Sequence, residues 1–159
     1  MDRISVFLAH AVKLETEAVR CFEDLAAAME SWGNPEVGAF FGRMAEYARL
    51  HQQDAMARAG FRGLPQLAAD EWQWPDGKSP EQADWIGLDG LTGVEHALNL
   101  ALQSERSSRD FYRHIANTSP DAKVCVMARE FAAEEEAHVA EVTKRILALG
   151  GEVEPEDGE

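Results

Sequence analysis

Five acidic and histidine side chains interrupt stretches of the sequence that are otherwise apolar at helical spacing. Glu15 and Glu105 each lie four residues after an alanine and seven before an aromatic residue, which places each in the middle of an apolar helix face. His51 lies between two alanines of another such face, and Glu135 and His138, three residues apart, share a further one. A charged group on a buried helix face is costly unless it is paired or binds a metal ion. We therefore interpret these five residues as candidate metal ligands.

The types of these side chains indicate which ions they would bind. Carboxylate oxygens and imidazole nitrogens suit iron, manganese or zinc better than copper(I) or an iron–sulfur cluster. Cys21 and Cys125 are the only cysteines, and their separation excludes a CxxC motif for a rubredoxin-type iron site, a zinc knuckle or a thioredoxin-like pair. We interpret both thiols as small core or surface residues of a reducing compartment. His10, His96 and His114 have no partner at ligand spacing and are predicted to lie at surface or boundary positions.

Four segments carry apolar residues at spacings of three and four, which predicts four helices. Their expected ranges are about 3–30, 35–60, 94–117 and 121–149. Proline and glycine signals separate the first helix from the second, and Ser119-Pro120-Asp121 opens the fourth. Short connections pair consecutive helices as hairpins. The sequence therefore predicts an all-α fold, an antiparallel four-helix bundle over residues 1–150.

Two segments outside the helices complete the predicted organisation. Between about 60 and 92, glycines and prolines replace the helical periodicity, which predicts one long crossover between the second and third helices. Trp72, Trp74 and Trp85 lie in this crossover and are expected to pack against the helices. Five of the last nine residues are acidic, and we interpret 151–159 as an acidic disordered tail.

The five candidate ligands lie near the midpoints of their helices. In an antiparallel bundle the midpoints fall in one layer, so these side chains can converge. A half-repeat supports this arrangement, because residues 11, 15, 22 and 26 match 101, 105, 112 and 116 at an offset of 90, and 44, 45, 48 and 51 match 131, 132, 135 and 138 at an offset of 87. Duplication of one helical hairpin would place two halves of a site face to face.

A carboxylate from each of two helices and a Glu-x-x-His pair from each of the other two form the pattern of ferritin-like di-iron carboxylate proteins. Over residues of about 5–149 the sequence resembles the rubrerythrin branch of this superfamily, in the forms that lack a rubredoxin domain. The residues that carry the resemblance are Glu15 with Phe22, Glu46 with His51, Glu105 with Tyr112, and Glu135 with His138. The resemblance implies a carboxylate-bridged pair of irons that reacts with peroxide or oxygen, as a peroxidase in some members and as a ferroxidase in others.

One position departs from the family pattern. The second helix of the family offers a bridging glutamate three residues before its histidine, where this sequence has Ala48. Glu46 cannot replace it, because two residues along a helix rotate its side chain roughly 160° away. Asp54, one turn beyond His51, lies on the correct face and is a possible extra ligand. A salt bridge between Asp54 and a neighbouring arginine is the simpler interpretation.

Three functions remain open from the sequence. In the first, an iron-dependent oxidoreductase, Glu15 and His51 hold one iron. Glu105 and His138 hold the second, and Glu135 bridges the two. In the second, the degenerate site holds a single zinc, manganese or iron ion without redox turnover. In the third, the chain is a helical interaction module without metal, whose charged interior residues neutralise one another by hydrogen bonding.

The composition limits the expected partners. The 29 acidic and 15 basic residues give a formal charge of −14, which repels nucleic acid and attracts metal cations. No apolar run is long enough to span a membrane, and the N-terminus lacks the features of a signal peptide, so we expect a cytoplasmic protein without a membrane partner. The family resemblance implies a homodimer. A peroxidase of this kind would need a separate electron donor, a reductase or a rubredoxin.

Overall fold

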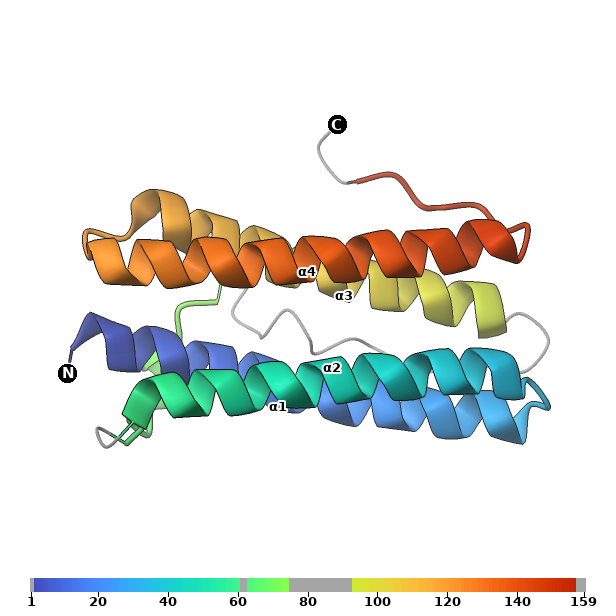
Figure 1. Cartoon of the computed structure of the whole chain (residues 1–159), viewed down its shortest axis with the longest axis horizontal. Coiled ribbons are helices and arrows are strands. Elements are labelled where there is room, and N and C mark those ends of the chain that lie inside the picture. The colour runs from blue at the N-terminus through green and yellow to red at the C-terminus, as the bar shows by residue number, and fades with distance from the viewer. Residues whose placement is uncertain (1, 61–62, 75–92, 157–159) are drawn as a thin grey trace.

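Four long helices form the fold in the computed structural model, which describes residues 2–60, 63–74 and 93–156. The helices are α1 (Arg3–Ser31), α2 (Pro35–Ala59), α3 (Gly93–Thr118) and α4 (Ala122–Ala148), and a short 3₁₀ helix, η2 (Ala69–Glu71), follows α2. The α1–α2 hairpin lies on one side of the molecule and the α3–α4 hairpin on the other (Figure 1). The predicted all-α four-helix bundle is thus confirmed, and no described helix could span a lipid bilayer.

The directions of the helices can be followed in Figure 1. Each hairpin is antiparallel, and α3 runs in the same direction as α2 (Figure 1). Bundles with one long crossover share this arrangement. The crossover was predicted over about 60–92, and its residues 61–62 and 75–92 lie outside the described part of the chain.

Side-chain caps mark the starts of α1, α2 and α4 within a few residues of their predicted limits. The Asp2 carboxylate accepts a hydrogen bond from the Ser5 amide at 2.8 Å, and the Asn34 side chain accepts one from the Val37 amide at 3.2 Å. The Asp121 side chain caps α4 in the same way. Each cap satisfies an amide group that has no partner inside its helix. The cap at Asp121 explains why Ser119-Pro120-Asp121 located the start of α4 in the sequence.

The apolar core consists of two clusters with a polar layer between them. One cluster includes Phe22 and Phe41, and the other includes Phe7, Tyr112 and Phe131. On each helix the residues of one cluster give way to those of the other near the helix midpoint, where the candidate ligands lie. The core therefore encloses these polar groups from both ends of the bundle.

His10 is buried, which contradicts one prediction from the sequence. We expected a surface or boundary position, as His96 and His114 have, but only 2% of His10 is exposed. Its Nδ1–H donates to the Val6 carbonyl at 2.8 Å, and its Nε2 accepts from the Gln73 amide at 2.8 Å. The crossover thereby supplies the partner that sequence spacing did not reveal.

Two tryptophans of the crossover surround the same imidazole. The ring centroids of Trp72 and Trp74 lie 4.9 and 4.8 Å from that of His10, and Trp74 also packs on Phe111. Their predicted packing against the helices is confirmed. Trp85 lies outside the described residues.

The ionisation of His10 predicts how stability changes with pH. Burial lowers the pKa of His10 from 6.5, and its hydrogen bond to the Val6 carbonyl opposes this effect only in part. Between the lowered pKa and 6.5, the unfolded chain binds a proton at His10 that the folded chain does not bind. The free energy of unfolding must therefore fall as the pH drops through this window, by up to about 1.4 kcal/mol per pH unit.

Urea denaturation of metal-free protein above and below pH 6.5 measures this dependence. We expect the His10→Phe variant, which keeps an aromatic ring but cannot bind a proton, to lose less stability on acidification than the wild type. His96→Gln is the matched control, because His96 is exposed. Equal pH slopes for His10→Phe and the wild type would contradict the prediction.

The C-terminal segment differs from its prediction as a disordered tail over 151–159. Residues 151–156 lie against α3, where the buried Asn99 side chain donates to the Glu152 carbonyl at 3.1 Å and accepts from the Glu154 amide at 3.0 Å. Arg109 pairs with Glu156. The prediction rested on the acidic composition of the segment, which does not reveal the asparagine and arginines of α3 that bind it. Residues 157–159 lie outside the described part.

Candidate metal centre

The five candidate ligands come from all four helices and lie in the polar layer between the two core clusters. Glu15 lies on α1, His51 on α2, Glu105 on α3, and Glu135 and His138 on α4. All except His51 are buried, and His51 is partly buried. Each of these helices buries its apolar face, so the charged side chains on that face point into the bundle. The structure therefore brings the five predicted residues together.

Each hairpin repeats one contact. In the α1–α2 hairpin, Glu15 Oε1 lies 3.7 Å from His51 Nδ1. In the α3–α4 hairpin, His138 Nδ1 is hydrogen-bonded to Glu105 Oε2 at 3.3 Å. These pairs occupy equivalent positions of the half-repeat, so its two copies contribute equivalent halves of the centre.

The two halves meet across the middle of the bundle. The imidazole rings of His51 and His138 stack with their centroids 4.9 Å apart and their planes inclined by 8°. Glu135 Oε2 lies 3.5 Å from His138 Nδ1, and one ligand atom from each of His51, Glu135 and His138 lies within 4.8 Å of the others. Three donors at this separation can surround a single cation, with Glu15 and Glu105 adjacent to them.

Burial and neighbouring charges shift the ionisation of the central groups. Burial and the nearby His138 lower the pKa of His51, which favours the neutral imidazole that binds metals. Burial would raise the pKa of Glu135, but its interactions with Glu105 and His138 lower it below its ordinary value. Glu135 is therefore favoured as the anion, the form that binds a cation.

Two buried atoms of the centre test whether a metal ion fits. His51 Nδ1 and Glu135 Oε2 are inaccessible to solvent, and neither has a hydrogen-bond partner among the described residues. A buried acceptor without a partner is unfavourable, and nitrogen and oxygen acceptors of these kinds are ligands for iron, manganese and zinc. The donor set and its two unsatisfied atoms therefore fit a divalent cation of this group.

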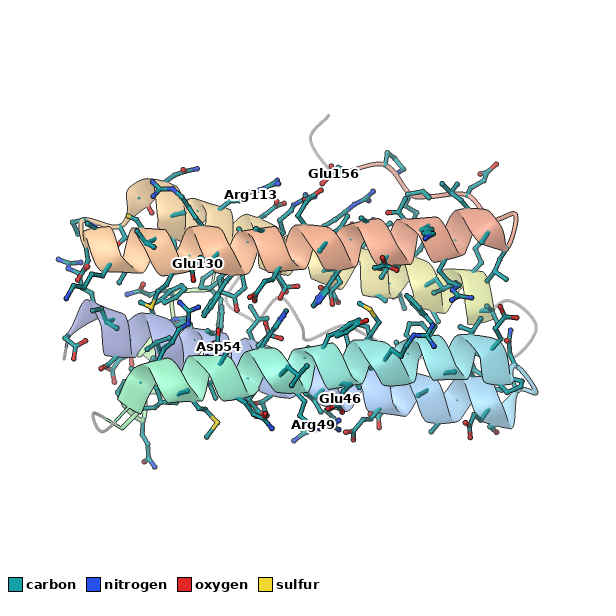
Figure 2. The ribbon with its side chains drawn as sticks, viewed as in Figure 1. Glu46, Arg49, Asp54, Arg113, Glu130 and Glu156 are labelled. Carbon is teal, nitrogen blue, oxygen red and sulfur yellow. The ribbon has the colours of Figure 1, made fainter. Side chains whose placement is uncertain are left out.

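The structure does not bring Asp54, the possible extra ligand, into the centre. Its carboxylate lies 3.1 Å from Arg58 Nε, and the same guanidinium reaches Glu130 of α4 at 2.8 Å. Asp54 and Glu130 lie on the sides of α2 and α4 that face each other (Figure 2). The arginine pair that was the simpler interpretation is therefore present.

Ala48 and Glu46 also occupy the positions expected from helix geometry. Ala48 is buried in one of the core clusters and offers no ligand atom. Glu46 pairs with Arg49 on the side of α2 away from α4 (Figure 2). The second helix therefore contributes His51 to the centre but no carboxylate from either position.

Glu134 is the residue at the centre that sequence reasoning missed. Its Oε2 lies 3.3 Å from His51 Nε2, on the ring edge opposite Glu15. Burial and the neighbouring carboxylates of Asp54 and Glu135 raise its pKa. Glu134 was overlooked because residues 134–136 are all glutamates and only Glu135 shares the apolar stripe of α4. The half-repeat carried a usable signal, because it pairs position 134 with the aromatic Tyr47, whose ring stacks on His138.

A small hollow lies beside the Glu134 carboxylate. The residues that line it are Ala11, Glu15, His51, Tyr112, Phe131 and Glu134. Two carboxylates and an imidazole thus face one hollow whose other walls are apolar or aromatic.

Comparison with known proteins places the fold in a family. The chain is similar to the crystal structure of an uncharacterized conserved protein from Magnetospirillum magnetotacticum MS-1, with 30% identity over 98% of this chain and 99% of that chain and a TM-score of 0.78. It also shares its fold with the bacterioferritin-related protein from Bacteroides fragilis, described as a dodecameric thioferritin, with 23% identity over 92% of this chain and 86% of that chain and a TM-score of 0.66. A scan against protein-family models and a search of curated proteins gave no match. The chain therefore belongs to the family of the conserved Magnetospirillum protein, and it has a ferritin-like four-helix fold.

Proposed function

We propose that this protein binds iron at the carboxylate–histidine centre and uses it as an oxidoreductase, for peroxide reduction or ferrous iron oxidation. The observation that carries the proposal is the convergence of three buried glutamates and two histidines from four helices on one layer of the core. Two acceptor atoms in this layer lack partners among the described residues, and the formal charge of −14 attracts cations to the protein. A bound pair of irons would supply one-electron steps toward peroxide or oxygen.

The protein residues have distinct tasks in this proposal. Glu15 and His51 would hold one ion, Glu105 and His138 the other, and Glu135 would reach both. The Glu105–His138 hydrogen bond at 3.3 Å holds the imidazole in place in the absence of metal. The apolar clusters at both ends of the layer keep water away from the ligands, which strengthens their interaction with a cation.

Metal content per chain tests the proposal. Purified protein is reconstituted anaerobically with ferrous iron, desalted and subjected to elemental analysis. We expect two irons per chain, followed by consumption of peroxide or oxygen in a stopped-flow assay. A protein that retains no iron, zinc or manganese would overturn the proposal and leave the helical interaction module as the remaining interpretation.

A second candidate function is the binding of a single ion without redox turnover. Two observations favour it. Position 48 offers no carboxylate, and among the described residues the group of donor atoms within 4.8 Å of one another has three members, from His51, Glu135 and His138. Zinc suits a small set of nitrogen and oxygen ligands and has no redox chemistry. One ion per chain, with zinc preferred over iron in competition, would select this candidate.

The proposed partners follow from the same chemistry. Peroxide or oxygen would be the substrate, and a separate reductase or rubredoxin would supply electrons to a peroxidase. The Bacteroides protein is described as a dodecamer, and for this chain we propose self-association as a homodimer in the cytoplasm. Analytical ultracentrifugation at several protein concentrations distinguishes a dimer from a monomer and from a larger shell.

A further inference from the structure

The two histidines of the centre turn the same ring nitrogen toward the glutamate of their own hairpin. In the α1–α2 hairpin, His51 Nδ1 lies 3.7 Å from Glu15 Oε1. In the α3–α4 hairpin, His138 Nδ1 lies 3.3 Å from Glu105 Oε2. Both halves of the repeat therefore present Nδ1 to the carboxylates of the centre, which leaves Nε2 on the other edge of each ring.

A carboxylate of α4 contacts this second nitrogen of His51. Glu134 Oε2 lies 3.3 Å from His51 Nε2, and this is the one ion-pair contact of Glu134 among the described residues. Glu130 and Glu136, which flank it along α4, pair with arginines instead. The Glu134 carboxylate is thus held against an imidazole, whereas the neighbouring carboxylates are held by guanidinium groups.

The equivalent position in the other half of the repeat also contacts a histidine of the opposite hairpin. The offset of 87 pairs Glu134 with Tyr47 of α2. The Tyr47 ring stacks on His138, with centroids 5.7 Å apart and planes inclined by 18°. In each half, the side chain at this position therefore supports the imidazole that the other half supplies. Tyr47 does so through the ring face, and Glu134 does so at a ring nitrogen.

The proton of a neutral imidazole lies on one of its nitrogens, and the surroundings of His51 favour Nε2. Nδ1 is inaccessible to solvent and has no hydrogen-bond partner among the described residues, and Glu15 Oε1 at 3.7 Å is too far to accept a proton from it. A proton on Nε2 instead faces the Glu134 carboxylate, which attracts an N–H group and repels a nitrogen lone pair. The Nδ1 lone pair then remains available to a cation beside Glu15.

We propose that Glu134 is a positioning residue of the metal centre, which holds His51 with its proton on Nε2 and its Nδ1 turned toward the ion at Glu15. This inference rests on the proposed metal-binding function. A histidine ligand whose other nitrogen donates to a carboxylate has a fixed orientation and is a more basic ligand. Among the described residues His138 contacts carboxylates only through Nδ1, so the two halves hold their histidines by different contacts.

Nitrogen-15 NMR of metal-free protein measures the position of this proton directly. In long-range proton–nitrogen spectra of histidine-labelled protein, a ring nitrogen that carries a proton and one that does not have well-separated shifts. At about pH 8, above the ordinary pKa of histidine, we expect His51 to carry its proton on Nε2. Glu134→Ala should remove this preference, whereas Glu134→Gln should retain it, because the amide oxygen can accept the same N–H. The His51→Gln spectrum identifies the signals of His51.

Zinc titration tests whether this contact supports metal binding, without any need for turnover. We expect Glu134→Ala to weaken the ion at His51 by about tenfold, the lower end of the range for residues that hold a histidine ligand, because Glu134 is 38% exposed. Glu134→Gln should recover part of this affinity. Glu141→Ala is the matched control, because it removes the same charge from an exposed position of the same helix.

A double-mutant comparison shows whether Glu134 acts through His51. We expect Glu134→Ala to weaken the ion that remains in a His138→Gln background and to have no further effect in a His51→Gln background. Circular dichroism of the metal-free variants checks that all of them keep the helical fold.

The outcomes separate this inference from the function on which it rests. If the proton of His51 lies on the same nitrogen in the wild type and in Glu134→Ala, or if that variant binds zinc as tightly as the wild type, the positioning role is overturned and metal binding stands. Equal losses in the His51→Gln and His138→Gln backgrounds would also overturn it, since the effect would not depend on His51. If the wild type binds neither zinc nor ferrous iron, the proposed function fails and this inference fails with it.

Discussion

Metal loading is expected to raise the melting temperature of the wild-type protein by about 8–16 °C. A ligand that binds only the folded state stabilises it by about 4 kcal/mol at a free concentration of about 1,000 times its Kd. A domain of this size gains about 2–4 °C per kcal/mol. The large effect reflects the buried carboxylates of the centre, which in metal-free protein must share protons or remain charged. Differential scanning calorimetry with excess metal and with EDTA measures the difference.

The His138→Leu variant provides the comparison for this prediction. His138 is buried, so leucine can occupy its place in the core. We expect the variant to melt within a few degrees of the wild type in EDTA, because the loss of the 3.3 Å hydrogen bond to Glu105 is offset by apolar packing. With metal present it should lose most of the gain. If metal leaves the wild-type melting temperature unchanged and the leucine variant melts higher in both conditions, the charged layer is a metal-free structural feature.

Loss of the Glu135 carboxylate is expected to have the largest effect on metal affinity. Glu135 is the buried acidic residue at the centre in the middle of α4, and one of its oxygens has no hydrogen-bond partner among the described residues. In the Glu135→Gln variant the side chain keeps its shape but loses its charge and one ligand oxygen. Because the proposal assigns this residue to both ions, affinity should fall by at least about a hundredfold for each. Isothermal titration with ferrous iron or cobalt measures the two constants.

The neighbouring glutamate provides the control for that measurement. Glu136 pairs with Arg109 and Arg113, and it faces away from the centre on the exposed side of α4. Glu136→Gln should therefore keep both affinities, although it removes the same charge from the next position of the helix. If Glu135→Gln and Glu136→Gln bind metal equally well, the ions are bound elsewhere in the protein.

Much of this architecture was determined by the sequence alone. The spacing of apolar residues predicted four helices, and the caps at Asp2, Asn34 and Asp121 act through local hydrogen bonds that short-range sequence signals encode. The same periodicity located Glu15, Glu105 and Glu135 on buried faces, because a helix face follows from residue spacing without knowledge of its neighbours. The half-repeat also predicted which positions of the helices should lie next to one another. The pairing of Glu15 with His51 and of Glu105 with His138 agrees with it.

Contacts between segments far apart in the sequence were decided only by the tertiary structure. His10 is buried because Trp72 and Trp74 of the crossover cover it, and no local pattern encodes that contact. The C-terminal segment lies on α3 because Asn99 and the arginines of that helix bind its backbone and carboxylates.

Glu134 illustrates the same limit at the centre itself. Its place one residue from the apolar stripe of α4 predicts a side chain at the edge of the helix, and only the neighbouring helix determines what that edge meets. Here α2 places His51 Nε2 at 3.3 Å from Glu134 Oε2. Sequence periodicity thus specifies which face of a helix is buried, while the packing of α2 against α4 specifies which charged groups at the margin of that face become neighbours.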